Sequence, residues 1–374
     1  MKRDLGRRAR KRSLTPFLLA SAAAAAGGIA WLNACASPLR AERVRTATLP
    51  PVVDGDLEVA RAYAPWIFKE VHPAKGRQDL PAPVDFDGDL DGENNWDNFP
   101  SFELTPTVYY AALGTKTHLF LAYHIFHPRD WTGFDLGLHQ SHENDGENLQ
   151  VVVDRASGKV VLLFAQAHYR GVAYAPVGSG IESARVKIRG APLLVDDSGV
   201  PSPEGKHACV FVESGGHGIY GTTDSRARVA ISPAGEARFS RTGLVFRPAR
   251  DGEPVPEPPL DAEGPVPYRL ESTTAKLWPL LRSGELVGEG RLLDGPLPYE
   301  DPRVRIGVPR YYEADRFSGP FGPDRGISPF AVDFAFRAPT LGALFFDPAR
   351  RYAESLAVPE PWSLEYEAFP FRTP

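Results

Sequence analysis

Residues His118 to Glu147 hold the densest group of metal-binding side chains in this sequence. Five of the nine histidines lie there with several carboxylates, most closely spaced in His142-Glu143-Asn144-Asp145-Gly146-Glu147. Hard divalent cations bind carboxylate oxygens, and imidazole nitrogens bind metals of intermediate character. The segment therefore predicts a divalent-cation site.

The order of residues selects the ligands within this segment. An apolar run from Thr117 to Phe126 predicts a strand that ends at His127-Pro128-Arg129-Asp130, because proline cannot donate to a strand ladder. Asp145 and Glu147 lie two residues apart at the start of the next strand, so both side chains point to one face. We expect one ion to be surrounded by Asp130, His142, Asp145 and Glu147. The expected bystanders are His118, His124 and Glu143.

A second acidic run, Asp87-Gly88-Asp89-Leu90-Asp91-Gly92-Glu93, precedes the cluster. It matches the first half of a calcium loop, but position twelve is Asn98 and not the bidentate Glu. The run fits either a second metal loop or a solvated acidic turn, and its candidate ligands are Asp87, Asp89 and Asp91.

Two further histidines are expected to line a ligand site, His168 at a strand end and His217 in a glycine-rich turn where backbone can approach closely.

The N-terminus predicts export. A basic leader precedes an uncharged, alanine-rich run that ends in Leu32-Asn33-Ala34-Cys35, which resembles a bacterial lipoprotein cleavage box. Residues 1–35 are therefore expected to be a signal peptide with Cys35 lipidated, and residues 36–57 a linker. Ordinary cleavage near Ala36 or Ala41, or an uncleaved anchor, remain alternatives, because about 20 apolar residues can span a bilayer.

Charge and cysteine content exclude several classes of protein. Removing the net charge of +6 carried by residues 1–34 from the −5 of the whole chain leaves −11, so an acidic body remains. Nucleic acid is not an expected partner, because it is bound by clustered Lys and Arg. With only Cys35 and Cys209 in the chain, a disulfide framework and a cysteine-based zinc site are also excluded.

Short alternating or apolar runs predict an all-β, antiparallel β-sandwich with long loops. The clearest strands are expected at 107–113, 117–126, 149–154 and 159–167, and peripheral helices at 58–62, 273–281 and 348–356. A segment rich in Pro, Gly and acidic residues, 250–267, is expected to be an extended surface loop. We expect one domain over residues 58–374, with a C-terminal elaboration after this loop.

The motifs resemble those of a known family. Phe126-His127-Pro128-Arg129-Asp130 followed by His142-Glu143-Asn144-Asp145-Gly146-Glu147 is similar to the signature of the necrosis- and ethylene-inducing cytolysins. The resemblance implies a β-sandwich in which Asp130, His142, Asp145 and Glu147 surround Ca²⁺ or Mg²⁺. Ser141, Asn144 and Gly146 replace other residues of that signature, so its surface for selecting a head group is not carried over and cytolysis is not expected.

A second resemblance is to bacterial and fungal proteins related to vacuolar protein sorting sixty-two. It rests on Ala62-Tyr63-Ala64-Pro65-Trp66, on Pro81-Ala82-Pro83-Val84-Asp85, and on Gly216-His217 within a later glycine-rich turn. Together the two resemblances cover about residues 60–225. Both place the expected β-sandwich and its cation site in this part of the chain.

Three functions fit these observations. The first is an exported, lipid-anchored protein of the bacterial envelope, in the outer membrane or periplasm or secreted, that uses a divalent cation to bind a glycan or a polar lipid head group. The second is a metal-dependent hydrolase of an envelope or extracellular polymer, with Glu143 or Glu147 as base. The third is a structural envelope lipoprotein. The common nucleophile, phosphate-loop, dinucleotide and zinc-protease motifs are all missing from the sequence, which favours the first function over the second.

Overall fold

The structure is a computed structural model, and it describes residues 56–131, 142–167, 170–184, 187–286, 291–292, 300–301, 304–305 and 347–369. The chain divides into two compact units, Met1–Ala41 and Glu42–Pro374, and every described residue belongs to the second. The expected signal peptide, most of the linker, Cys35, His168 and the side chain of His142 therefore lie outside the described part.

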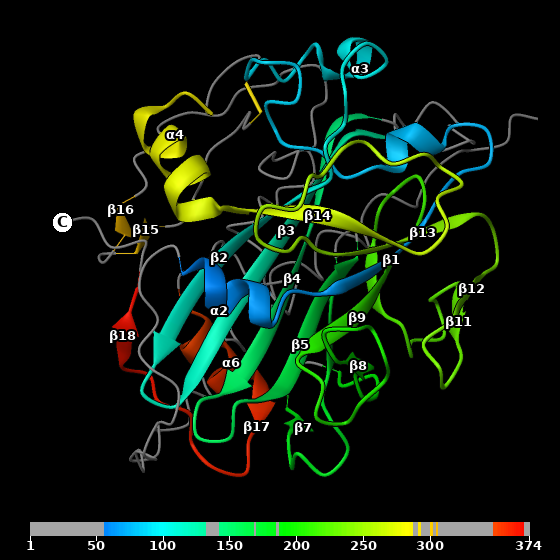
Figure 1. Cartoon of the computed structure of the whole chain (residues 1–374). Coiled ribbons are helices and arrows are strands. Elements are labelled where there is room, and N and C mark those ends of the chain that lie inside the picture. Colours follow the sequence, from blue (N-terminus) through cyan, green and yellow to red (C-terminus); the bar gives the residue numbers. More distant parts are fainter. Residues whose placement is uncertain are drawn as a thin grey trace, which may run out of the picture. The chain divides into compact units, whose positions relative to one another are not determined.

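Strands dominate the described residues, which confirms a β-rich fold (Figure 1). The strands before residue 200 are β1 (Trp66–Glu70), β2 (Thr107–Thr115), β3 (His118–Asp130), β4 (His142–Asp154), β5 (Lys159–Ala167), β6 (Arg170–Tyr174), β7 (Glu182–Ser183) and β8 (Leu194–Val195). The later strands are β9 (His207–Val212), β10 (Ile219–Gly221), β11 (Val229–Ile231), β12 (Ala237–Phe239), β13 (Gly243–Pro248), β14 (Pro265–Ser272), β15 (Glu300–Asp301), β16 (Val304–Arg305), β17 (Leu356–Ala357) and β18 (Tyr366–Ala368).

The helices are short. They are α2 (Leu57–Ala62), the 3₁₀ turn η1 (Gly76–Asp79), α3 (Asn95–Asn98), the π-turn η2 (Thr273–Leu277), α4 (Trp278–Ser283) and α6 (Pro348–Ser355). Asp56 caps α2 by accepting a hydrogen bond from the Val59 amide at 3.0 Å, which satisfies one free N–H of the first turn. Each of the three helices expected from the sequence is therefore found within a few residues of its expected bounds. No helix in the described part of the chain is long and apolar enough to cross a membrane.

The main sheet is mixed and not purely antiparallel, which corrects one part of the expected fold. Its strand order is β10-β9-β1-β13-β14-β2-β3-β4-β5-β6, with β18 beside β2 and β8 beside β9. The pairs β1–β9, β13–β14 and β14–β2 are parallel. Parallel neighbours need long connections, and hydrophobic periodicity carries no information on which distant strands will meet.

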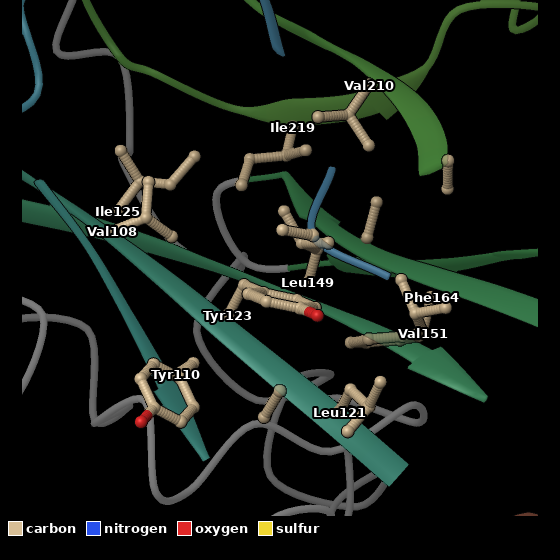
Figure 2. Packing of buried hydrophobic residues seen from close by; sticks show 14 of the residues in the cluster. Val108, Tyr110, Leu121, Tyr123, Ile125, Leu149, Val151, Phe164, Val210 and Ile219 are labelled. Carbon is tan, nitrogen blue, oxygen red and sulfur yellow. The ribbon is translucent and has the colours of Figure 1, made fainter. Parts of the chain in front are cut away.

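The hydrophobic core lies between two layers of this sheet. Figure 2 shows Val210 of β9 and Ile219 of β10 above Tyr123 and Leu149, which belong to β3 and β4. These four side chains are almost completely buried. The opposite face of β3 is covered by α6, where Phe120 stacks on Tyr352 with ring centroids 5.9 Å apart. Both faces of the β3–β4 hairpin are therefore buried.

The β3–β4 hairpin is longer than expected. β3 continues through Pro128 to Asp130, and β4 already begins at His142. Pairing between β2 and β3 ends at Ile125, so β3 beyond this point is paired only with β4 among the described strands. Proline is tolerated in a strand where one edge has no ladder partner, which explains why Pro128 does not end the strand.

Candidate metal centre

The centre of the site is a pair of residues that face each other across the β3–β4 hairpin. His127 on β3 is the register partner of Asp145 on β4. Opposite residues in an antiparallel pair have their side chains on the same face. The same alternation continues inward to Ile125 opposite Glu147, so this face passes directly into the buried core.

A glycine-rich turn brings His217 to this pair. The turn joins β9 to β10, and His217 adopts a positive φ of 49°, which is uncommon for a residue with a side chain. Its Nδ1 lies 2.7 Å from Oδ2 of Asp145. His127, Asp145 and His217 each offer one ligand atom, and these atoms all lie within 4.8 Å of one another. All three residues are buried.

Asp79, at the end of η1, holds the turn from the other side. Its Oδ1 lies 3.1 Å from Nε2 of His217 and accepts the Gly215 amide at 2.8 Å, while Oδ2 accepts the His72 amide at 2.7 Å. Burial alone would raise the pKa of Asp79, but these hydrogen bonds and the charge of Lys69 together lower it. The carboxylate is therefore ionised and fixed in place, and it sets the orientation of the His217 ring.

Lys69 supplies a buried positive charge to the site. The side chain lies on β1, and its ammonium donates to the Glu213 carbonyl at 2.8 Å. Burial lowers the pKa of Lys69 to about 8, although Asp79 and Asp145 partly oppose the shift. At neutral pH this ammonium therefore compensates part of the negative charge of the two aspartates.

His127 differs from the other residues of the cluster in its hydrogen bonding. It is fully buried, and neither of its ring nitrogens has a hydrogen-bond partner among the described residues. Its ring stacks on that of His217 with centroids 3.7 Å apart and an interplanar angle of 12°. Burial, with the nearby charges of His217 and Lys69, lowers the pKa of His127 well below its usual range. A neutral imidazole, which has one ring nitrogen with a free lone pair and one N–H, is the form that binds metal ions.

The structure describes the side chains of three of the four ligands expected from the sequence. Asp145 is in the cluster, and Glu147 lies on the same strand two residues further along, buried. Asp130 is the register partner of His142, whose side chain is outside the described part. Among the described residues, the three-residue cluster contains neither Asp130 nor Glu147. The complete set of four stays a prediction.

The acidic loop, residues 87–93, contacts the β3–β4 hairpin. Asp89 and Asp91 accept amides two residues further along, from Asp91 and Glu93, at 2.8 and 2.9 Å. The loop is tied to β4 through Asn144, which donates to the Gly92 carbonyl at 2.5 Å and accepts from Asn95. These contacts use the carboxylates to shape the loop, and cation binding by Asp87, Asp89 and Asp91 stays a prediction.

Sequence reasoning missed three members of the site. His127 was visible beside Pro128 in the motif, but the expected end of the strand removed it from the ligand face. Asp79 and Lys69 lie at least 48 residues before it in the sequence, and no local pattern connects them with His217. His217 itself was expected at a ligand site because a glycine-rich turn allows close approach, and it does contact Asp145.

Comparisons with known proteins return solved structures only. No model of a protein family matches the sequence, and no curated protein matches it. A structure described as a toxin fold for microbial attack and plant defence is 18% identical, covers 49% of this chain and 77% of its own, and gives a TM-score of 0.28. Necrosis and Ethylene inducing Protein 2, from the causal agent of cocoa's Witches Broom disease, is 13% identical, covers 65% and 87%, and gives 0.28.

A third similar structure is NLPPya in complex with glucosamine, which is 19% identical, covers 47% of this chain and 75% of its own, and gives a TM-score of 0.27. The same protein is also found in complex with mannosamine. A necrosis- and ethylene-inducing protein is among the similar solved structures.

Proposed function

We propose that this protein binds a divalent cation beside the β3–β4 hairpin and uses it to recognise a glycan or a polar lipid head group. The observation that carries the proposal is the buried cluster of His127, Asp145 and His217. A buried polar group without a partner costs about 1–3 kcal/mol, and His127 has two such nitrogens among the described residues. A bound ion would give one of these nitrogens a partner.

The surface next to the cluster suits a polar ligand. Trp131 is half-buried, and its amide donates to the Gly215 carbonyl at 3.2 Å, so it lies beside the turn that carries His217. Lys75 is exposed, with its ammonium 3.3 Å from the centroid of the Trp131 ring. An aromatic ring, a cation and a metal ion can together contact the apolar and polar faces of a sugar or head group.

The cation expected from the sequence is Ca²⁺ or Mg²⁺, because Asp130, Asp145 and Glu147 offer several oxygens with His142. The described cluster has two imidazoles and one carboxylate instead. Both ligand sets share Asp145, so the proposal of a cation site holds for either set.

An array experiment tests the proposal. The full chain is applied to glycan and lipid arrays in each divalent cation and in chelator, with glucosamine and mannosamine among the probes. We expect cation-dependent binding that disappears in Asp145→Asn and persists in the matched control Asp154→Asn at the other end of the hairpin. Binding that is equal with and without chelator would refute the role of the ion. Release of products from a polymer would instead indicate a metal-dependent hydrolase, and a folded protein without any ligand would indicate a structural lipoprotein.

We also propose export and anchoring through a lipid on Cys35. The support is the sequence of the leader and its Leu-Asn-Ala-Cys ending. Fractionation of cells and mass spectrometry of the N-terminus provide the test, with Cys35→Ser as the variant. We expect a diacylglyceryl modification in the membrane fraction and release of the variant to the soluble fraction. An unmodified N-terminus after Ala36 or Ala41 would contradict the anchor.

A further inference from the structure

We propose that the cluster binds a divalent transition metal of intermediate character, such as Zn²⁺ or Co²⁺, through His127, His217 and Asp145, with Asp79 positioning His217. This inference rests on the proposed function of the cluster as a cation site. It differs from the oxygen-rich ligand set expected from the sequence in both the ligands and the class of metal.

The donor atoms favour this class of metal. Ca²⁺ takes six to eight oxygen ligands and Mg²⁺ prefers oxygens and waters, whereas imidazole nitrogens suit Zn²⁺, Co²⁺ and related ions. Two of the three donors here are imidazoles, from His127 and His217. Three protein ligands leave a fourth position open in a tetrahedral site. That position would accept a water molecule or a hydroxyl of the bound head group.

The spacings between the donor atoms are close to those around one ion. Zinc–nitrogen and zinc–oxygen distances are about 2.0–2.2 Å, so two ligands of one tetrahedral ion lie roughly 3.4 Å apart. In the structure, Nδ1 of His217 and Oδ2 of Asp145 are 2.7 Å apart, and no pair of the donor atoms is separated by more than 4.8 Å. Shifts of about an ångström, roughly the difference between these spacings and the tetrahedral one, bring the donors to the right distances. The His127 ring, which stacks at 12° on His217, also has to turn so that its nitrogen lone pair points at the same ion.

Asp79 occupies the position of an outer carboxylate. A metal-binding histidine usually donates its second ring N–H to a carboxylate, which fixes the ring and the tautomer. Nε2 of His217 lies 3.1 Å from Asp79, which leaves Nδ1 directed at Asp145 as the metal-binding nitrogen. Asp79 is itself held by the amides of Gly215 and His72. The His217 ring is therefore oriented before an ion arrives.

The hydrogen bonds among the described residues leave both ring nitrogens of His127 without a partner. Every other polar side chain named in the cluster has a contact in the structure: His217 with two aspartates, Asp79 with two amides, and Lys69 with a carbonyl. His127 instead stacks flat on His217, with its ring edge left for a ligand. An apolar residue of similar size would fill this position without the cost of an unpaired buried group.

Metal competition on the full chain, purified without a histidine tag and stripped of metal, tests the inference. We expect Zn²⁺ and Co²⁺ to bind about 100-fold or more tightly than Ca²⁺ and Mg²⁺ by calorimetry, and Co²⁺ to give visible absorption bands. His127→Leu should weaken Zn²⁺ binding at least about 100-fold, since one of three protein ligands is lost. Asp79→Asn should weaken it about 10–100-fold. The control His118→Leu should bind as the wild type does.

The outcomes separate this inference from the proposed function. Tighter binding of Ca²⁺ than of Zn²⁺, or wild-type Zn²⁺ affinity in folded His127→Leu, would overturn the inference but leave a cation site. If no ion binds the wild type, both fail. Circular dichroism and thermal melting of each variant show whether it is folded, and Asp79→Asn provides an independent test should His127→Leu not fold.

Discussion

The two ends of the β3–β4 hairpin each carry a buried histidine opposite a buried aspartate. At one end His118 is the register partner of Asp154, and at the other His127 is the register partner of Asp145. His118 is satisfied locally, because Nδ1 contacts the Thr117 hydroxyl at 2.8 Å. His127 has no such partner among the described residues.

The remaining contacts at these ends differ in the same way. Asp154 accepts the amide and hydroxyl of Ser157 at 2.7 and 2.8 Å, and Trp362 stacks on His118 with ring centroids 4.3 Å apart. The contacts named at this end are those of a turn and of side-chain packing. Residue type and burial are the same at both ends. The two ends differ in whether the buried histidine has a hydrogen-bond partner.

The largest difference is expected in metal affinity. Asp145→Asn should weaken binding of the preferred ion about a thousandfold, because roughly 10–16 kcal/mol of metal binding is shared among three or four ligands. Asp154→Asn should change it less than about twofold, since Asp154 belongs to the turn at the other end. Calorimetric titration of both folded variants measures the contrast. An equal loss of metal affinity in the two variants would contradict the proposal that only the Asp145 end of the hairpin binds the ion.

The next effect is on the pH dependence of stability. Burial lowers the pKa of His124, in the middle of β3, to about 4, against about 6.5 for an unfolded histidine. Between these pH values the unfolded chain takes up a proton that the folded chain does not. Stability present above pH 6.5 is therefore lost as the pH falls toward 4, by up to about 3 kcal/mol.

Urea denaturation in chelator between pH 4 and 7 measures this loss. His124→Gln removes the titrating group and should flatten the pH profile by the same amount. A profile that is unchanged in the variant would show that His124 is not the group responsible.

Replacing His127 and His118 by leucine is expected to change the free energy of unfolding in opposite directions. In chelator, His127→Leu should raise the free energy of unfolding by about 1–2 kcal/mol, because it removes an unpaired buried polar ring at similar volume. His118→Leu should lower it by about 1–2 kcal/mol, since a hydrogen bond and the stacking on Trp362 are lost. Chemical denaturation of both variants provides the measurement, and destabilisation of equal size at the two positions would contradict it.

The smallest contrast is between the glycines in the turns at the two ends. Gly215→Ala should cost about 2 kcal/mol, because φ is 85° and the new Cβ would lie 2.8 Å from the Trp131 carbonyl oxygen. Gly158→Ala, with φ of 68° and only an ordinary contact to Tyr63, should cost about 1 kcal/mol. Thermal melts compare them, and a larger loss in Gly158→Ala would be inconsistent with the tight turn at the site.

Local sequence patterns predicted the hairpin but not its surroundings. Apolar alternation indicated β3, β4 and β5. Which end of the hairpin leaves a buried histidine without a hydrogen-bond partner could not be predicted from local patterns. Thr117 and Ser157 supply the contacts at one end from nearby in the sequence. The other end is completed by Asp79 and His217, which long-range parallel pairing of β1 and β9 brings together.

The motif resemblance implied Asp130, His142, Asp145 and Glu147 as the ligand set, and this set stays a prediction. Spacing alone grouped Asp130 with Asp145, and the expected stop at Pro128 made Asp130 a strand end. In the structure β3 continues past Pro128, and Asp130 pairs with His142 while His127 faces Asp145. The position of one strand end therefore decided which residues were predicted as ligands.

The most direct test of the account is a crystal structure of the protein soaked in Zn²⁺, with anomalous diffraction data at the zinc edge. We predict one peak about 2.0–2.2 Å from ligand atoms of His127, His217 and Asp145, with Nε2 of His217 still on Asp79. A peak among Asp130, His142 and Glu147 that leaves His127 unbound would contradict this assignment, and no peak near the hairpin would contradict a zinc site at this end.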